Sequence, residues 1–184
     1  MKKIIVGFII ALGVFQACKK EETKTDDSKQ NTPVNAPSDT ITNFMVKFYS
    51  LKDSSTQVAN YNDPDGAGPK PGSSGGVVLT ANTDYEITYR IEDGSNPSNP
   101  VVLNNKIQTN SKDYILCASS NMGITVNAAD NDGKYPLGLI HKFTTGSSSS
   151  GKFYFSLKYQ KGIKNGSCDI GVEQVNCSIP IQVN

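Results

Sequence analysis

The sequence predicts an all-β protein, in the form of an antiparallel β-sandwich of about seven to nine strands. Beyond residue 40 the apolar side chains recur with a period of two, most clearly in the segment 84–92, DYEITYRIE. This alternation is typical of strands with one buried face. Clusters of Gly, Pro, Asn, Asp and Ser separate such segments at short intervals, which favours many short strands over long helices.

Each expected strand follows from its own apolar pattern. In the first, Phe44, Val46 and Phe48 share one face. Pro180 interrupts the last alternation, and because proline has no N–H for the sheet ladder, we expect this strand to lie at an edge or to carry a bulge. A helical turn is indicated only at 104–112. The remaining strands are expected at 76–80, 101–103, 114–118, 124–128, 137–144, 152–160 and 175–183.

The N-terminal segment has the pattern of a secretory signal. Lys2 and Lys3 precede the uncharged stretch 4–15, IIVGFIIALGVF. As a helix this stretch would extend about 18 Å, which is short of the roughly 30 Å hydrocarbon core of a bilayer. The segment therefore predicts export rather than a permanent transmembrane helix.

The residues that follow resemble the signal of bacterial lipoproteins, in which a small residue, here Ala17, precedes an acceptor cysteine, here Cys18. The resemblance implies that residues 1–17 are cleaved and that Cys18 carries acyl chains. Such chains hold a protein at a membrane because each buried methylene contributes about 0.8 kcal/mol. Lys19 directly after the cysteine argues against retention in the inner membrane. The run 19–22, KKEE, resembles the surface-export signal of Bacteroidota lipoproteins, and its alternative is an ordinary solvated charge cluster.

Residues 18–40 are expected to form a flexible, disordered linker. Between residues 19 and 39 the chain has one Val and no other large apolar side chain. Such a segment cannot bury enough surface to offset its ordering entropy. We therefore divide the chain into a signal peptide at 1–17, a lipid-anchored linker at 18–40 and a β-sandwich domain at 41–184.

Charge and histidine content exclude several classes of function. The 184 residues include 18 Lys and Arg against 17 Asp and Glu, one His and no Trp. This near balance gives no basis for nucleic-acid binding, which needs a basic excess over one face. His141 has no nucleophile or orienting group beside it in the sequence. We therefore interpret it as a strand residue on the outward or rim side, and we expect neither an enzyme nor a cofactor.

Three cysteines, Cys117, Cys168 and Cys177, remain in an oxidising compartment once Cys18 is acylated. The sequence favours a disulfide between Cys168 and Cys177, whose ten-residue ring would contribute roughly 2.7 kcal/mol in the chain-entropy model. A Cys117–Cys177 bridge is the rival, because both residues fall on the apolar faces of their expected strands. A chain without a bridge is the third alternative.

Two Asp-rich turns raise a calcium hypothesis. One contains Asp63 and Asp65, and the other contains Asp130 and Asp132. Neither completes a calcium-binding loop, because no acidic residue occupies the first or the last ligand position. We interpret both as turns stabilised by local side-chain hydrogen bonds. The weaker hypothesis is that they meet at one end of the sandwich and share a calcium ion.

The strongest charge asymmetry lies at residues 134–168, which include six lysines and no acidic residue. On the strand expected at 152–160, Lys152, Tyr154, Lys158 and Gln160 share one face. This face would suit an anionic glycan or another envelope polymer, through charge and stacking on Tyr154. The alternative is an outward face whose lysines discourage edge-to-edge association of strands.

Five segments form an ordered set, namely DPDG at 63–66, LTANTDY at 79–85, DGKYPLGL at 132–139, TTG at 144–146 and LKYQKGIK at 157–164. In these segments the chain resembles a group of uncharacterised Bacteroidota lipoproteins with small immunoglobulin-like sandwiches. The resemblance implies an envelope location and an immunoglobulin-like fold. It implies no catalytic residue.

Together these observations predict a lipid-anchored outer-membrane protein, exposed at the cell surface, whose sandwich is a non-catalytic binding or structural module. The expected partners are the membrane, through Cys18, and an envelope protein or glycan. The alternative is a carbohydrate-associated or anionic-glycan-binding module. The lack of Trp and the dispersed Tyr residues argue against that alternative, because stacking platforms need flat aromatic side chains at neighbouring exposed positions.

Overall fold

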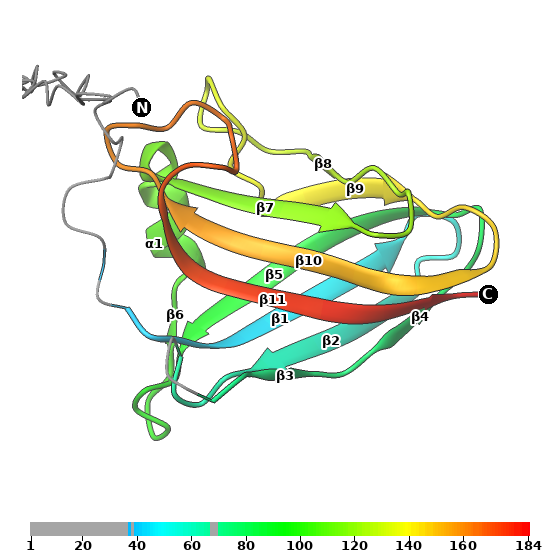
Figure 1. Ribbon diagram of the computed structural model, residues 1–184, viewed down its shortest axis with the longest axis horizontal. Helices are drawn as coiled ribbons and strands as arrows, with labels where there is room; N and C mark the ends of the chain where they lie inside the picture. The colour runs from blue at the N-terminus through cyan, green and yellow to red at the C-terminus, as the bar shows by residue number, and fades with distance from the viewer. Residues whose placement is uncertain (1–36, 38, 67–69) are drawn as a thin grey trace, which may run out of the picture. The chain divides into compact units, whose positions relative to one another are not determined.

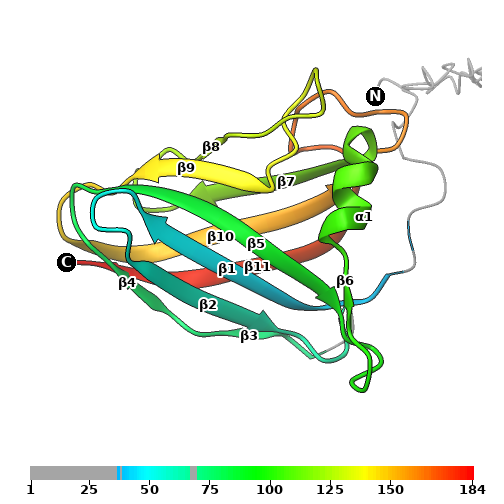
Figure 2. The ribbon, with the colours of Figure 1, turned by 180° about the vertical axis from the view of Figure 1, so that it is seen from behind.

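A computed structural model describes residues 37, 39–66 and 70–184, which form two β-sheets packed against each other (Figures 1 and 2). The predicted all-β sandwich is confirmed. The first sheet has the order β3 (Ser73–Ser74), β2 (Thr56–Asn62), β1 (Ile41–Ser50), β5 (Asp84–Asp93), β9 (Ile140–Thr144) and β8 (Asn127–Ala128), with β6 (Val101–Val102) paired to β5. The second has the order β4 (Val77–Leu79), β11 (Val172–Val183), β10 (Ser149–Tyr159) and β7 (Tyr114–Ser120).

The connection between β5 and β7 contains the helical structure. It holds a short α-helix, α1 (Asn104–Thr109), and a 3₁₀ turn, η1 (Ser111–Asp113). These elements confirm the helical turn predicted at 104–112. Within the described part of the chain, no helix is both long and apolar enough to cross a membrane.

The order of the strands is that of an immunoglobulin-like sandwich. Strands β5, β9 and β8 lie in one sheet and β7, β10 and β11 in the other, as strands B, E, D and C, F, G do in immunoglobulin domains. Strand β4 runs parallel to the end of β11, and the other strand pairs of the described residues are antiparallel. Strand β1 pairs with β5 in the position of strand A, and β2 and β3 extend the first sheet beyond it.

Alternation along the strands brings aromatic side chains of both sheets into one core. On β10, Phe153, Phe155 and Leu157 point inward and are at most 1% exposed. The ring centroid of Phe155 lies 6.1 Å from that of Phe44 and 5.5 Å from that of Tyr89, both in the opposite sheet. Aromatic pairs of this geometry contribute about 0.5–1.5 kcal/mol beyond the burial of their area. The two sheets are therefore held together through their inner faces.

Two features of the strand pattern differ from the sequence prediction. Strand β2, TQVANYN, is not predicted, because Ala59 is its only buried residue and the segment shows little apolar alternation. The eleven strands also exceed the expected seven to nine. The excess consists of β2 and of β3, a two-residue pairing that is too short to produce an apolar period, whereas β6 and β8 lie within the strands expected at 101–103 and 124–128.

Pro180 does not lie on an edge strand, because β11 runs between β10 and β4. The pairing with β4 begins only at Ile181, so Pro180 precedes the paired segment. The expected bulge is present in β11 but lies elsewhere, at Gln174, where the register with β10 shifts. The edge alternative was wrong because the strand expected at 76–80 pairs with β11, and a pairing between residues so far apart in the chain leaves no mark in the sequence pattern.

The Phe155→Ala substitution is expected to lower the free energy of unfolding by about 3–5 kcal/mol, because it leaves a cavity between the sheets. The matched control is Tyr154→Ala on the same strand, which removes a ring that is already 39% exposed. This control is expected to lower the free energy of unfolding much less than Phe155→Ala does. Urea unfolding of the full chain measures both, and equal losses in the two variants would contradict the inward orientation of Phe155.

Candidate functional site

Three connections between strands meet at one end of the sandwich, beside α1 (Figures 1 and 2). They are the β5–β7 connection, the β8–β9 connection and the β10–β11 connection, and we call this region the loop end. Loops that a rigid sandwich holds at one end are frequent positions for binding residues. The loop end therefore has the placement that binding sites on sandwich folds commonly have.

The ammonium group of Lys164 joins all three connections. Its Nζ lies 2.8 Å from Asp132 Oδ2 and donates a hydrogen bond to the Ser111 carbonyl oxygen at 2.8 Å. The side chains of Lys164 and Asp132 are each only 4% exposed. Burial raises the pKa of Asp132, but Lys164 and the backbone N–H groups of Tyr135 and Lys134 outweigh burial and lower this pKa to about 2. The Asp132 carboxylate is therefore ionised, and its contact with Lys164 is structural.

Asp130 orders the β8–β9 connection from within. Its carboxylate accepts hydrogen bonds from the backbone N–H groups of Gly138, Leu139 and Ile140, at 2.8, 3.0 and 3.2 Å. Gly138 has a φ of +83°, and a Cβ at this position would overlap the Leu116 carbonyl oxygen. Glycine is thus required where this connection crosses β7.

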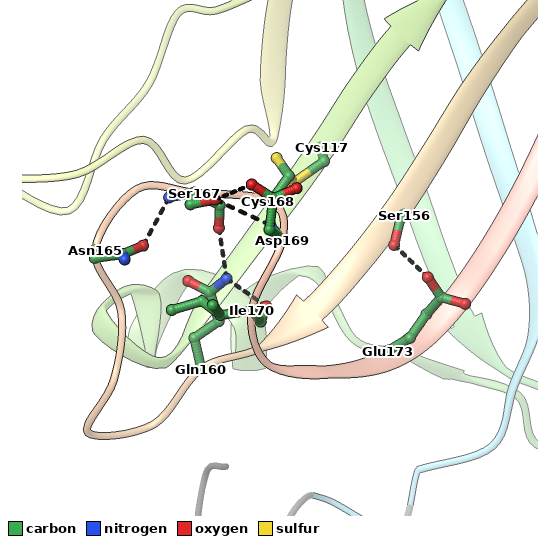
Figure 3. Close-up of a disulfide and its surroundings, with 9 residues drawn as sticks. All are labelled: Cys117, Ser156, Gln160, Asn165, Ser167, Cys168, Asp169, Ile170 and Glu173. Carbon is green, nitrogen blue, oxygen red and sulfur yellow. Dashed lines mark hydrogen bonds between the residues drawn. A yellow bond between two sulfur atoms is a disulfide. The ribbon is translucent and has the colours of Figure 1, made fainter. Parts of the chain in front are cut away.

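A disulfide ties the β10–β11 connection to the outer side of β7. It joins Cys117 and Cys168, whose Cα atoms lie 6.0 Å apart (Figure 3). Neither predicted pairing forms, and the favoured Cys168–Cys177 bridge was wrong. Cys177 points into the core and is a free thiol. Cys117 lies on the opposite side of β7 from the core residue Leu116, where the returning loop brings Cys168 next to it.

Gln160 departs from its predicted position on the face of Lys152 and Tyr154. It is fully buried, and its Nε2 donates hydrogen bonds to the carbonyl oxygens of Ser167 and Ile170, at 2.8 Å each (Figure 3). The β10–β11 connection folds back over this side chain. Strand alternation alone cannot reveal such a cover, because it comes from residues further along the chain.

The predicted basic face on β10 is present in part. Lys152 and Tyr154 are exposed, and Lys158 is half-buried. Lys158 is paired in register with Glu173 of β11, which accepts a hydrogen bond from Ser156 Oγ at 2.9 Å (Figure 3). A carboxylate therefore sits among the lysines, and the face is less basic than the sequence suggested.

The two Asp-rich turns are occupied by local contacts. Asp63 is buried and its Oδ2 accepts a hydrogen bond from the Tyr61 hydroxyl at 3.1 Å, while Asp65 Oδ2 accepts one from the Lys70 N–H at 3.3 Å. Asp130 and Asp132 are engaged as described above. Among the residues that the structure describes, no three His, Cys, Asp or Glu side chains are placed to hold a metal ion. The structure therefore does not bring the four carboxylates together for a shared calcium ion.

His141 lies in the core and not on the outward or rim side. It is 2% exposed, and its Nδ1 lies 2.9 Å from the Tyr89 hydroxyl oxygen. The prediction was wrong because the inward-facing positions of β9 are His141 and Phe143, whereas Lys142 between them is exposed. Burial lowers the pKa of His141 to about 4, although Asp130 opposes this shift. Burial likewise raises the pKa of the Cys177 thiol to about 12.

A cleft of about 600 Å³ opens among the three connections of the loop end. Its lining includes Lys112, Asp113, Lys134 and Tyr135, together with the buried Asp132–Lys164 pair. The Nζ of Lys134 lies 4.6 Å from the centroid of the Tyr135 ring, and this side chain raises the pKa of Lys134. The lysine-rich segment 134–168 signals part of this cleft. Lys112 and Asp113 lie outside this segment and carry no such signal, because folding alone brings them to the cleft.

The predicted signal peptide at 1–17 and the acceptor Cys18 lie outside the described residues, as does most of the linker at 18–40. Near its end, Asp39 forms an ion pair with Lys106 of α1 at 2.6 Å.

Comparison with known proteins found no matching family model, no matching curated protein and no matching solved structure. The function is therefore inferred from the residues of the chain and their arrangement.

Peptide mapping without reduction is expected to recover a linked pair of peptides that contain Cys117 and Cys168, and Cys177 as a free thiol. The Cys117→Ala/Cys168→Ala variant should lose about 4 kcal/mol of unfolding free energy, because the bridge joins residues at a sequence separation of 51. The Cys177→Ala variant is the control that leaves the bridge intact. Recovery of a Cys168–Cys177 peptide would contradict the observed pairing.

The imidazole of His141 is expected to stay neutral as the pH falls from 7 to 5, because its pKa in the folded protein is about 4. The unfolded chain takes up this proton near pH 6.5. The contribution of His141 to the free energy of unfolding is therefore fully present above pH 6.5 and is lost progressively as the pH falls toward 4. His141 is the single histidine of the chain, so its proton NMR signals can be followed without ambiguity. A titration midpoint near 6.5 in the folded protein would show that the ring is not buried.

Proposed function

We propose that this chain is a lipid-anchored outer-membrane protein, exposed at the cell surface, whose immunoglobulin-like domain is a non-catalytic binding or structural module. The observation that carries the proposal is the segment that ends at Cys18. The chain begins with basic residues, continues with an uncharged stretch too short to span a bilayer, and then has a small residue before a cysteine. A polar linker and one domain follow this cysteine. This arrangement is what an anchored, projecting domain requires.

The position of the reactive side chains supports a non-catalytic role. A general base or nucleophile must reach its substrate, and its pKa must suit the operating pH. The imidazole of His141 is buried with a pKa of about 4, and the thiol of Cys177 is buried with a pKa of about 12. Both groups are therefore neutral near pH 7 and enclosed in the core, where they serve packing.

The loop end supports a binding role within this proposal. A disulfide and a buried ion pair hold its three connections together around an open cleft. Ordered loops lose less entropy when they bind a ligand. The lysines of this cleft favour the alternative in which the module binds an anionic glycan.

The Cys18→Ser variant is expected to lose fatty-acid labelling and to move from the membrane fraction to the soluble fraction, because the serine hydroxyl does not replace the acceptor thiol. Ser28→Ala, in the same linker, is the matched control and should stay in the membrane fraction. Protease added to intact cells should remove the wild-type domain, because the proposal places this domain at the cell surface. A Cys18→Ser protein that remains in membranes after a high-salt wash would overturn the anchor.

A further inference from the structure

The loop-end cleft carries an excess of positive charge. Lys112 and Lys134 are exposed and form no ion pair with any side chain in the described ranges. Asp132 is neutralised by Lys164, which leaves Asp113 as the acidic side chain of the lining without an ion pair. An anionic group in the cleft would therefore meet more attraction than repulsion.

The same cleft is held in shape before any ligand arrives. The Lys164 ammonium joins its three walls, and the Cys117–Cys168 bridge fixes the β10–β11 connection to β7. The ammonium group of Lys134 is held beside the Tyr135 ring, with its Nζ 4.6 Å from the ring centroid. Groups that are already oriented lose less side-chain entropy on binding. The cleft is therefore a better binding site than scattered surface lysines.

We infer that this cleft binds an acidic sugar residue, of the uronic acid class, within an envelope polysaccharide. The inference rests on the proposed role as an anchored binding module and names its ligand. Lys112 and Lys134 would hold the carboxylate as point charges, and the Tyr135 ring would contact the apolar side of the sugar ring. The volume of about 600 Å³ falls among small-ligand sites, which span about 300–1,000 Å³.

Charge complementarity favours an acidic sugar over a densely charged polymer. A nucleic acid needs a long basic stripe, and this chain has 18 basic against 17 acidic residues. Phosphate recognition commonly uses bidentate arginine, and Arg90 is the single arginine of the chain and is paired with Glu92. Two exposed lysines and one aromatic ring in the same cleft match one carboxylate on a ring-shaped body.

The cleft is also a better candidate than the face of Lys152, Tyr154 and Lys158 on β10. On that face Lys158 is half-buried and lies in register with Glu173. In the cleft, by contrast, the acidic Asp132 is already paired with Lys164. The two surfaces share no residue, so substitutions can distinguish them.

The test is a calorimetric titration of the full-length protein, purified in a neutral detergent, with oligogalacturonate. We expect saturable binding that weakens as salt is added, because both lysines are exposed. Lys112→Gln/Lys134→Gln should weaken binding by at least about tenfold, since charge-assisted hydrogen bonds are lost. The matched control, Lys47→Gln/Lys52→Gln, removes two exposed lysines of β1 and the following turn and should change binding by less than about twofold.

Parallel titrations use a neutral dextran oligosaccharide and inorganic phosphate, and neither should bind comparably. The inference is overturned if oligogalacturonate shows no saturable binding, if phosphate binds as tightly, or if the Lys112/Lys134 variant binds like wild type. It is also overturned if Lys152→Gln/Lys158→Gln removes binding instead, which would assign the ligand to the β10 face. None of these results changes the membrane fractionation of Cys18→Ser, so the proposed anchor is tested independently of the proposed ligand.

Discussion

The contact between the inner faces of the two sheets is the constraint on which this domain depends. Phe153 and Phe155 from the second sheet meet Phe44, Phe143 and Tyr89 from the first, and their rings occupy the space between the layers. Because β1, β5, β10 and β11 commit alternate side chains to this contact, most of their remaining side chains face outward. The chain is free to vary mainly in the connections at the ends of the sandwich.

At the loop end a polar interior replaces the apolar core. Lys164 is nearly as buried as the core residues, and an ammonium group at that depth is tolerated because Asp132 and the Ser111 carbonyl oxygen surround it. Three segments that are distant in sequence thereby acquire one fixed arrangement. The disulfide and Gln160 hold the last of these segments from its other side. Order of this kind in connecting segments is what a binding surface needs.

The same core buries the imidazole of His141 and the thiol of Cys177, two side chains that could otherwise act as a base or a nucleophile. His141 and Cys177 both occupy inward positions of their strands, where the imidazole contacts the Tyr89 hydroxyl and the thiol stays protonated. What remains on the surface is charge and hydrogen-bonding capacity. A domain of this composition is suited to bind or to support, and the proposed lipid anchor at Cys18 would keep it at the membrane while it does so.

The sequence by itself determined the fold class, because strand alternation is a local property and apolar residues at every second position must share a face. The segment 84–92 and the helical turn at 104–112 are recovered for this reason. Strand β2 is missed because its neighbours, rather than its own apolar residues, make it a strand. Only the tertiary structure decided the partner of Cys168, the burial of Gln160 and the walls of the cleft. Each of these depends on where a connection returns over the sandwich, and that path is set by contacts between residues far apart in the chain.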